Sequence, residues 1–119
     1  MTAEPTLDPG AIERLLEITG GDSAFVDELI DTYLQDAETQ LDALRQASSA
    51  GDVDALVRPA HSLKSSSDSV GAVALTSLCR ELELEARSRT VADPVVRVAL
   101  VADAFDAVRA GLLAARRRI

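Results

Sequence analysis

The sequence has few of the residues that build disulfides, metal clusters or aromatic cores. Its 119 residues include one cysteine, one tyrosine, two phenylalanines and no tryptophan. The single cysteine, Cys79, excludes an intramolecular disulfide and any metal site made of several cysteines. No apolar run reaches the roughly 18 residues that a membrane-spanning helix needs, and the opening MTAEPTLDPG lacks the regions of a secretory signal. We therefore expect a soluble, cytoplasmic protein that makes no membrane contact.

Positive charge is also scarce. Lys and Arg total 12 against 20 Asp and Glu, which leaves a formal net charge of -8. A surface of this sign repels nucleic-acid backbones and anionic lipid, so we expect no nucleic-acid partner. The chain has a single histidine, His61, and its single lysine, Lys64, lies three residues further on. This pairing of two otherwise absent residue types is the first indication of a functional site.

Apolar residues recur at helical spacing in five segments that glycine and proline separate. The segments cover about residues 8–18, 23–49, 52–68, 72–89 and a last one that follows Asp93 and Pro94. The pairs Asp8-Pro9 and Asp93-Pro94 are typical of an N-cap followed by proline at the first helical position. No segment shows the alternation of a strand, so the pattern predicts an all-α protein.

The buried side of each predicted helix follows from apolar residues three and four positions apart. The predicted core positions are Ile12, Leu15, Leu16, Val26, Ile30, Tyr33, Ala37, Leu41, Leu44, Leu56, Ala60, Leu63, Ser67, Leu75, Leu78, Leu82, Ala86, Val98, Val101, Phe105, Val108 and Leu112. Short connections favour antiparallel neighbours. We therefore predict an up-down-up-down four-helix bundle with a short N-terminal capping helix, in one domain over residues 1–119 with a core from about 8 to 115.

Pro59 conflicts with the third predicted helix. In a helix interior, proline removes one backbone hydrogen bond and crowds the carbonyl four residues earlier, here that of Ala55, at a cost of about 3 kcal/mol. Either the helix kinks at Pro59 or it begins later than Asp52. Departures from sequence rules collect at functional sites, and Pro59 precedes His61 by two residues.

Four residues of the third segment share one helical face: His61, Lys64, Ser65 and Asp68. That face lies away from the predicted core, so we expect an exposed imidazole with small neighbours such as Ser62. A neutral imidazole nitrogen is a nucleophile near neutral pH. A lysine one turn away favours the neutral ring and can pair with phosphate oxygens. The pattern predicts a phosphoryl acceptor, with Ser62, Ser65 and Asp68 as candidate contacts to the phosphate or to a partner.

The stretch AHSLKSSSDSVGA, residues 60–72, resembles the signature of histidine-containing phosphotransfer (HPt) domains. That signature is His, two residues, Lys, usually Gly, then small or hydroxyl residues and an aliphatic-Gly pair. GGDSAFVDELIDTYL and LTSLCRELELEAR resemble the family's helices before and after the motif. The resemblance implies a four-helix bundle in which His61 is the phosphoacceptor and Lys64 stabilises phosphohistidine. Ser65 departs from the family's Gly and places a hydroxymethyl group beside the histidine.

The resemblance also implies the protein's activity and partners. The chain would accept a phosphoryl group from the aspartyl phosphate of one receiver domain and pass it to another, in hybrid histidine kinases or response regulators. It would need no cofactor, because Mg²⁺ belongs to the receiver, and would have no kinase activity of its own. We expect a stand-alone monomer.

Two other functions stay open at this point. A non-transferring adaptor would bind a receiver or another signalling partner through the His61 face, and the residues that keep this alternative are Ser65 and Pro59. A metalloprotein or bundle enzyme is less well supported. One histidine and one cysteine on different predicted helices form no recognisable ligand set.

Overall fold

Five α-helices and one short 3-10 helix make up most of residues 4–117, the part of the chain that the computed structural model describes. They are α1 (Ala11–Ile18), α2 (Ser23–Ser49), η1 (Asp54–Leu56, the 3-10 helix), α3 (Val57–Ser69), α4 (Val73–Arg87) and α5 (Pro94–Arg116). This part of the chain contains no strand. None of its helices combines the length and the apolar character needed to cross a membrane.

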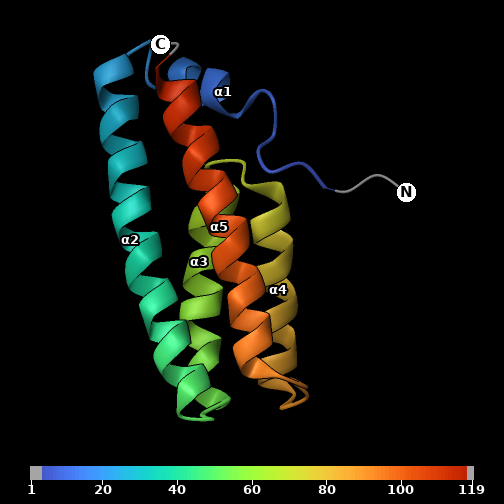
Figure 1. Ribbon diagram of the computed structural model, residues 1–119. Coiled ribbons are helices and arrows are strands. Elements are labelled where there is room, and N and C mark those ends of the chain that lie inside the picture. Colours follow the sequence, from blue (N-terminus) through green and yellow to red (C-terminus); the bar gives the residue numbers. More distant parts are fainter. Residues whose placement is uncertain (1–3, 118–119) are drawn as a thin grey trace.

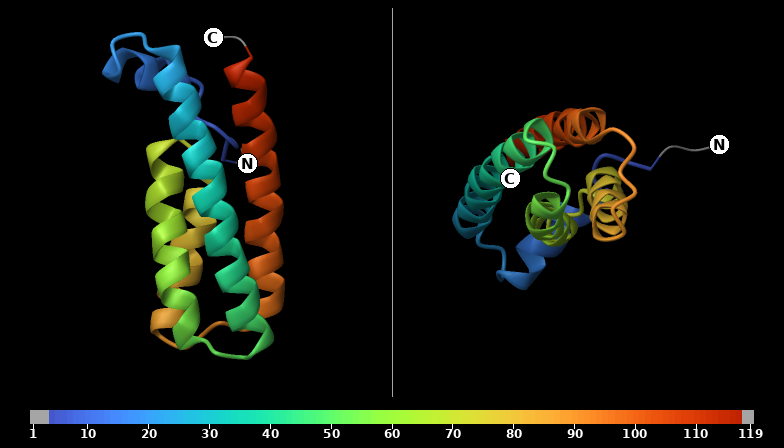
Figure 2. Two further views of the ribbon diagram at one scale, coloured as in Figure 1. Left: turned by 90° about the vertical axis from the view of Figure 1, so that its left-hand side faces the viewer. Right: turned by 90° about the horizontal axis from the view of Figure 1, so that it is seen from below.

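Helices α2 to α5 run side by side with alternating direction (Figure 1). Seen from below, they surround a common centre (Figure 2). The 27 residues of α2 and the 23 of α5 extend beyond α3, with 13, and α4, with 15. Helix α1 lies across the end where α3 and α4 stop short (Figure 2). This confirms the predicted four-helix bundle with an N-terminal capping helix.

The core contains the predicted apolar positions of α2, α3 and α5, all of which are buried. Its largest fully buried side chains are Phe105, Ile30, Leu41, Leu44, Leu56, Leu63, Leu75, Leu82 and Leu112. In α4, Leu78 is half-buried and packs against the core, and the fully buried side also contains Thr76, Cys79 and Glu83. In α1, Ile12 is buried and the other two predicted positions are half-buried.

The two predicted Asp-Pro helix starts differ in outcome. Asp93 caps α5 as predicted, because its side chain accepts a hydrogen bond from the Val96 N–H at 3.2 Å. The prediction at Asp8 is wrong, since α1 begins at Ala11 and Pro9 lies in the preceding turn. The reason is a long-range contact: the Asp8 N–H donates to the carbonyl of Gly71 at 2.8 Å and holds this segment against the α3–α4 connection.

Pro59 lies in the first turn of α3, so the helix begins later than predicted and needs no kink. The first turn of a helix has no internal partners for its N–H groups, so proline loses nothing there. Asp52 lies ahead of η1 and does not cap α3; its side chain accepts a hydrogen bond from the Ala55 N–H at 3.1 Å. Helix α4 stops at Arg87, two residues before its predicted end.

A buried hydrogen bond fixes the rotation of α3 against α2. The hydroxyls of Ser67 and Tyr33 lie 2.8 Å apart inside the bundle, beside the contact between Tyr33 and Phe105. Burial raises the pKa of Tyr33 to about 12, although the bond to Ser67 acts in the opposite direction. With Ser67 turned to the core, the opposite side of α3 faces outward, and His61 lies on it.

Candidate functional site

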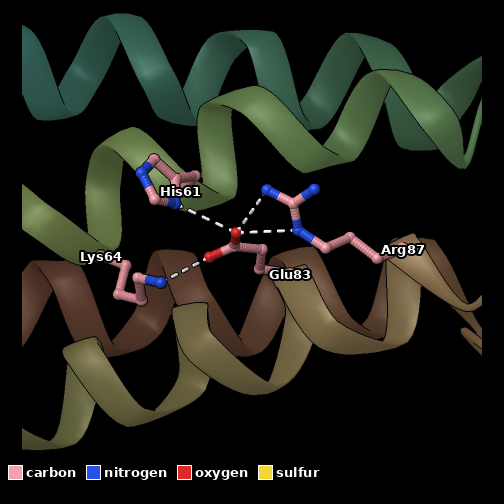
Figure 3. Close-up of polar contacts among 4 residues, drawn as sticks. All are labelled: His61, Lys64, Glu83 and Arg87. Atoms are coloured by element: carbon pink, nitrogen blue, oxygen red, sulfur yellow. Dashed lines mark hydrogen bonds and ion pairs between the residues drawn. The ribbon is translucent and has the colours of Figure 1, made fainter.

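His61 projects from the exposed side of α3, as the spacing predicts. Its side chain is 53% exposed. Its Nδ1 lies 3.0 Å from Oε2 of Glu83, a residue of α4 (Figure 3). An ionised carboxylate only accepts hydrogen bonds, so a neutral imidazole donates from Nδ1 and keeps its lone pair on Nε2. The arrangement selects one tautomer and leaves Nε2 as the nucleophilic nitrogen.

Glu83 is the centre of a polar cluster between α3 and α4. Its side chain is only 7% exposed. Oε1 accepts from Lys64 Nζ at 2.7 Å, and Oε2 accepts from His61 Nδ1 and from Arg87 Nε and Nη2, at 3.0, 3.0 and 2.8 Å (Figure 3). A buried carboxylate is tolerated only when its charge is compensated and its oxygens are hydrogen-bonded. Two cations and the imidazole provide this compensation.

The same contacts keep Glu83 ionised. Burial by itself would raise the pKa of the carboxyl, because it disfavours the charged form. The hydrogen bonds from Lys64, Arg87 and His61 outweigh burial and lower the pKa of Glu83 from 4.5 to about 2. At neutral pH the group therefore remains a carboxylate, which accepts a hydrogen bond from the Nδ1–H of His61.

Lys64 occupies a different environment from the one predicted for it. Its ammonium bonds to Glu83, and its side chain is 24% exposed. It does not pair with Asp68, which is exposed. Lys64 thus links α3 to α4 and compensates the buried carboxylate. An ammonium has three N–H donors, and its contact with a phosphoryl group stays a prediction.

Sequence reasoning missed Glu83 and Arg87. A signal for Glu83 was present, because it lies at helical spacing with Cys79 and Ala86, which are both buried. A carboxylate on the buried side of a helix requires cationic partners, and the sequence contains a single lysine, Lys64. Arg87 follows Glu83 by one turn, at the i,i+4 spacing of helical ion pairs.

The three candidate contacts Ser62, Ser65 and Asp68 are all exposed on α3. Ser62 lines an open hollow together with His61 and Arg87. Ser65 lies one turn after His61 on the outward side of the helix, where its hydroxymethyl group faces any approaching partner. The structure therefore places all three on the accessible side of the site, and their roles stay predictions.

The described residues give no support to the metalloprotein alternative. Within residues 4–117, no three His, Cys, Asp or Glu side chains are placed to hold a metal ion. Cys79 lies inside the core, and burial raises the pKa of its thiol to about 12, with Lys64 acting weakly in the opposite direction. A thiol in this state is a poor nucleophile and a poor metal ligand.

Comparison with known proteins places this site in a family. The model of the Hpt domain matches residues 28–111, which include all of α3 and α4. Among solved structures, the crystal structure of histidine-containing phosphotransfer protein B (HptB) from Pseudomonas aeruginosa PAO1 is 32% identical, with a TM-score of 0.87, and the match covers 98% of this chain and 99% of that chain. A comparison with curated proteins gave no match.

The chain therefore belongs to the Hpt domain family, and the resemblance seen in the sequence is confirmed. Family, fold and an exposed histidine together identify a histidine phosphotransfer protein of a phosphorelay, a class whose partners are receiver domains. The adaptor function is the less favoured alternative.

Proposed function

We propose that the protein carries a phosphoryl group on Nε2 of His61, between the aspartyl phosphate of one receiver domain and the aspartate of another. The observation that carries this proposal is the hydrogen bond from Nδ1 to Glu83 in a ring that is otherwise open to solvent. It supports Nε2 as the accessible nucleophile and holds the ring in one orientation.

In the transfer step, the Nε2 lone pair forms a bond to phosphorus while the bond from phosphorus to the receiver's aspartate oxygen breaks. The electron pair of the broken bond leaves with the receiver's carboxylate. The imidazole ring gains positive charge, and the Glu83 carboxylate beside Nδ1 stabilises it. Phosphoryl transfer depends mainly on positioning and electrostatics. Such a site therefore needs few reacting groups besides the imidazole. The reverse sequence delivers the group to the second receiver.

The remaining expectations fit a carrier rather than a catalyst. We propose that the chain has no kinase activity and no cofactor of its own, with Mg²⁺ held by the receiver domain. We also propose a cytoplasmic monomer in which residues 1–119 form one domain, of which 1–3 and 118–119 lie outside the described part. Ser65 in place of the family's Gly would then affect the choice of receiver.

Exposed apolar residues near the α1–α2 connection support docking of a receiver. Three large apolar residues near the α1–α2 connection are exposed: Ile18, Phe25 and Leu29. Ile18 lines a shallow hollow with Asp68 and Ser69, which follow His61 along α3. Exposed apolar side chains that gather together mark protein interaction sites. We assign the receiver's contact surface to this region and the outward side of α3.

The decisive test is transfer from a panel of phosphorylated receivers to the wild type and to His61→Gln. We expect acid-labile, base-stable label on the wild type and none on His61→Gln, with the same circular dichroism spectrum for both. Absence of label on the wild type with every receiver of the same organism would contradict the proposal. Full signalling activity of His61→Gln in cells would instead favour the adaptor.

Docking is tested by Phe25→Ser, with Val95→Ser as the matched control. Both residues are exposed and apolar, but Val95 lies in the first turn of α5, at the opposite end of the bundle from α1. We expect Phe25→Ser to slow transfer from a receiver by about fivefold to tenfold, as loss of an interface anchor does, while Val95→Ser transfers normally. Equal rates for the two variants would place the docking surface elsewhere.

A further inference from the structure

The N-terminal segment, residues 4–10, contacts the connection between α3 and α4 and then leads into α1 (Figure 1). The Asp8 N–H donates to the carbonyl of Gly71 at 2.8 Å, and the carbonyl of Pro5 accepts from the N–H of Ala74 at 3.1 Å. Helix α4 has no side-chain N-cap of its own, so the segment supplies a partner for one of its free N–H groups. We call residues 4–10 the strap.

Gly71 is the residue of the α3–α4 connection on which α1 rests. A Cβ added to Gly71 would lie 2.6 Å from the Cβ of Ala11 and 3.4 Å from that of Asp8. Ala11 is the first residue of α1 and is buried. The backbone sets the position of an alanine Cβ, so this atom cannot rotate away from a close contact. Only a residue without a side chain therefore allows α1 to lie so close to the connection.

The strap and this contact do much to hold α1 in place, because α1 has a small buried side. Only Ala11 and Ile12 of its eight residues are buried. The ion pair between Asp8 and Arg14 is exposed and contributes little. On its other side, the strap packs Leu7 beside Gly111 of α5, where an added Cβ would lie 2.8 Å from Leu7 Cδ1. The strap thus ties α1 to both α5 and the α3–α4 connection.

The contact between α1 and Gly71 also borders the hollow beside the proposed docking residues. This hollow has a volume of about 140 Å³ and is lined by residues of α1 on one side and by Asp68, Ser69 and Gly71 on the other. Ile18, the last residue of α1, lines it too and is 81% exposed. A shift of α1 away from Gly71 would therefore move Ile18 relative to the exposed side of α3.

We propose that Gly71 is a positioning residue for receiver docking, a role that rests on the proposed function. Because Gly71 has no Cβ, α1 lies against the α3–α4 connection, and α1 in turn holds Ile18 beside the exposed side of α3. The hydrogen bond that orients His61 comes from Glu83 and involves no atom of this contact. Binding of the receiver, and not the reactivity of the imidazole, should therefore depend on Gly71.

The test separates docking from chemistry by using two phosphoryl donors. A phosphorylated receiver must dock before it reacts, whereas phosphoramidate reaches Nε2 of His61 without docking. With phosphoramidate, the P–N bond of the reagent breaks as the bond from phosphorus to Nε2 forms, and ammonia leaves. The receiver is the one that labels the wild type fastest. Its concentration is varied to give KM and kcat of transfer, and the labelling rate with phosphoramidate is measured alongside.

The variant is Gly71→Ala, with Gly51→Ala as the matched control. Both glycines have a left-handed backbone, with φ of 74° and 66°, so alanine meets the same conformational strain at either position. At Gly51, however, an added Cβ has nothing within 4 Å. We expect Gly71→Ala to raise KM for the receiver about fivefold, as loss of interface contacts does, with kcat and the phosphoramidate rate unchanged. Gly51→Ala should match the wild type in all three.

Two further variants test the contact itself. Ala11→Gly removes the methyl group that a Cβ at position 71 would meet, so its combination with Gly71→Ala should return KM to that of Ala11→Gly alone. Leu7→Ala loosens the strap from α5 and leaves Gly71 unchanged, and it should also raise KM and not the phosphoramidate rate. Circular dichroism and urea denaturation show whether each rate refers to folded protein.

Several results would overturn the proposal. Equal KM values for Gly71→Ala and Gly51→Ala would exclude a role of the α1 contact in docking. An equal loss of rate with both donors would place the effect on the imidazole, and a double variant without rescue would exclude Ala11 as the cause. If Gly71→Ala does not fold, a normal KM for Leu7→Ala would overturn it. Failure of wild-type His61 to accept a phosphoryl group from either donor is distinguishable, because it would contradict the proposed function itself.

Discussion

The α2–α5 pair and the α3–α4 pair hold together in different ways. The long helices α2 and α5 meet through the apolar core, with ion pairs such as Arg109–Glu38 and Arg116–Asp31 at their exposed edge. The short helices α3 and α4 share a core as well, but they also enclose the ionised carboxylate of Glu83. Exposed ion pairs contribute little to stability, whereas a buried charge becomes costly as soon as it loses its partners.

This difference separates stability from chemistry. The core between α2 and α5 can be apolar, because no residue there takes part in the proposed transfer. The α3–α4 side holds the imidazole of His61 in one tautomer, because the buried carboxylate accepts a hydrogen bond from its Nδ1–H. Fixing the imidazole therefore requires a buried polar cluster, which costs stability. The burial of the apolar core offsets this cost.

The largest expected effect comes from Phe105→Ala, which removes a side chain of α5 from the core. Phe105 is fully buried, and truncating such a side chain costs about 3–5 kcal/mol through lost burial and an unfilled cavity. We expect the free energy of unfolding to fall by this amount in urea denaturation. In the fraction that stays folded, phosphoramidate should label His61 at a rate close to that of the wild type.

A large decrease in the labelling rate of folded Phe105→Ala would contradict this separation of stability from chemistry. It would mean that the core sets the geometry of the imidazole directly. A wild-type labelling rate together with a lowered free energy of unfolding would instead support the separation.

A smaller effect is expected from acid, and it acts on the α3–α4 side. The carboxyl of Glu83 has a pKa of about 2 in the folded protein against an ordinary value of 4.5. Above that ordinary value it is ionised in both states. At lower pH the unfolded chain takes up the proton first, so this group's contribution to stability is lost progressively until the pH approaches the folded pKa.

Glu83→Gln removes that proton uptake, so its free energy of unfolding should decrease less with acid than that of the wild type. The measurement is urea denaturation at about pH 7, 5 and 3. The matched control is Glu81→Gln, because Glu81 is an exposed residue of the same helix. Parallel pH profiles for the wild type and Glu83→Gln would contradict the assigned pKa.

Much of the fold was predictable because apolar residues recur at helical spacing within each helix. The bounds of α2 and the buried positions of α2, α3 and α5 agree with the spacing of apolar residues, and the exposure of His61 follows from the same pattern. The start of α1 was predicted wrongly because Asp8 bonds to Gly71, a residue far away in the sequence. Local rules for helix caps contain no information about such contacts.

The sequence by itself determined which helices form, which side of α2, α3 and α5 is buried, and that the single histidine lies on an exposed face. The tertiary structure alone decided that Glu83 meets His61, although 22 positions separate them along the chain. The spacing of apolar residues shows which side of a single helix is buried. The rotation and shift of two helices against each other depend on how their side chains fill the core. The partners of the imidazole follow from that packing.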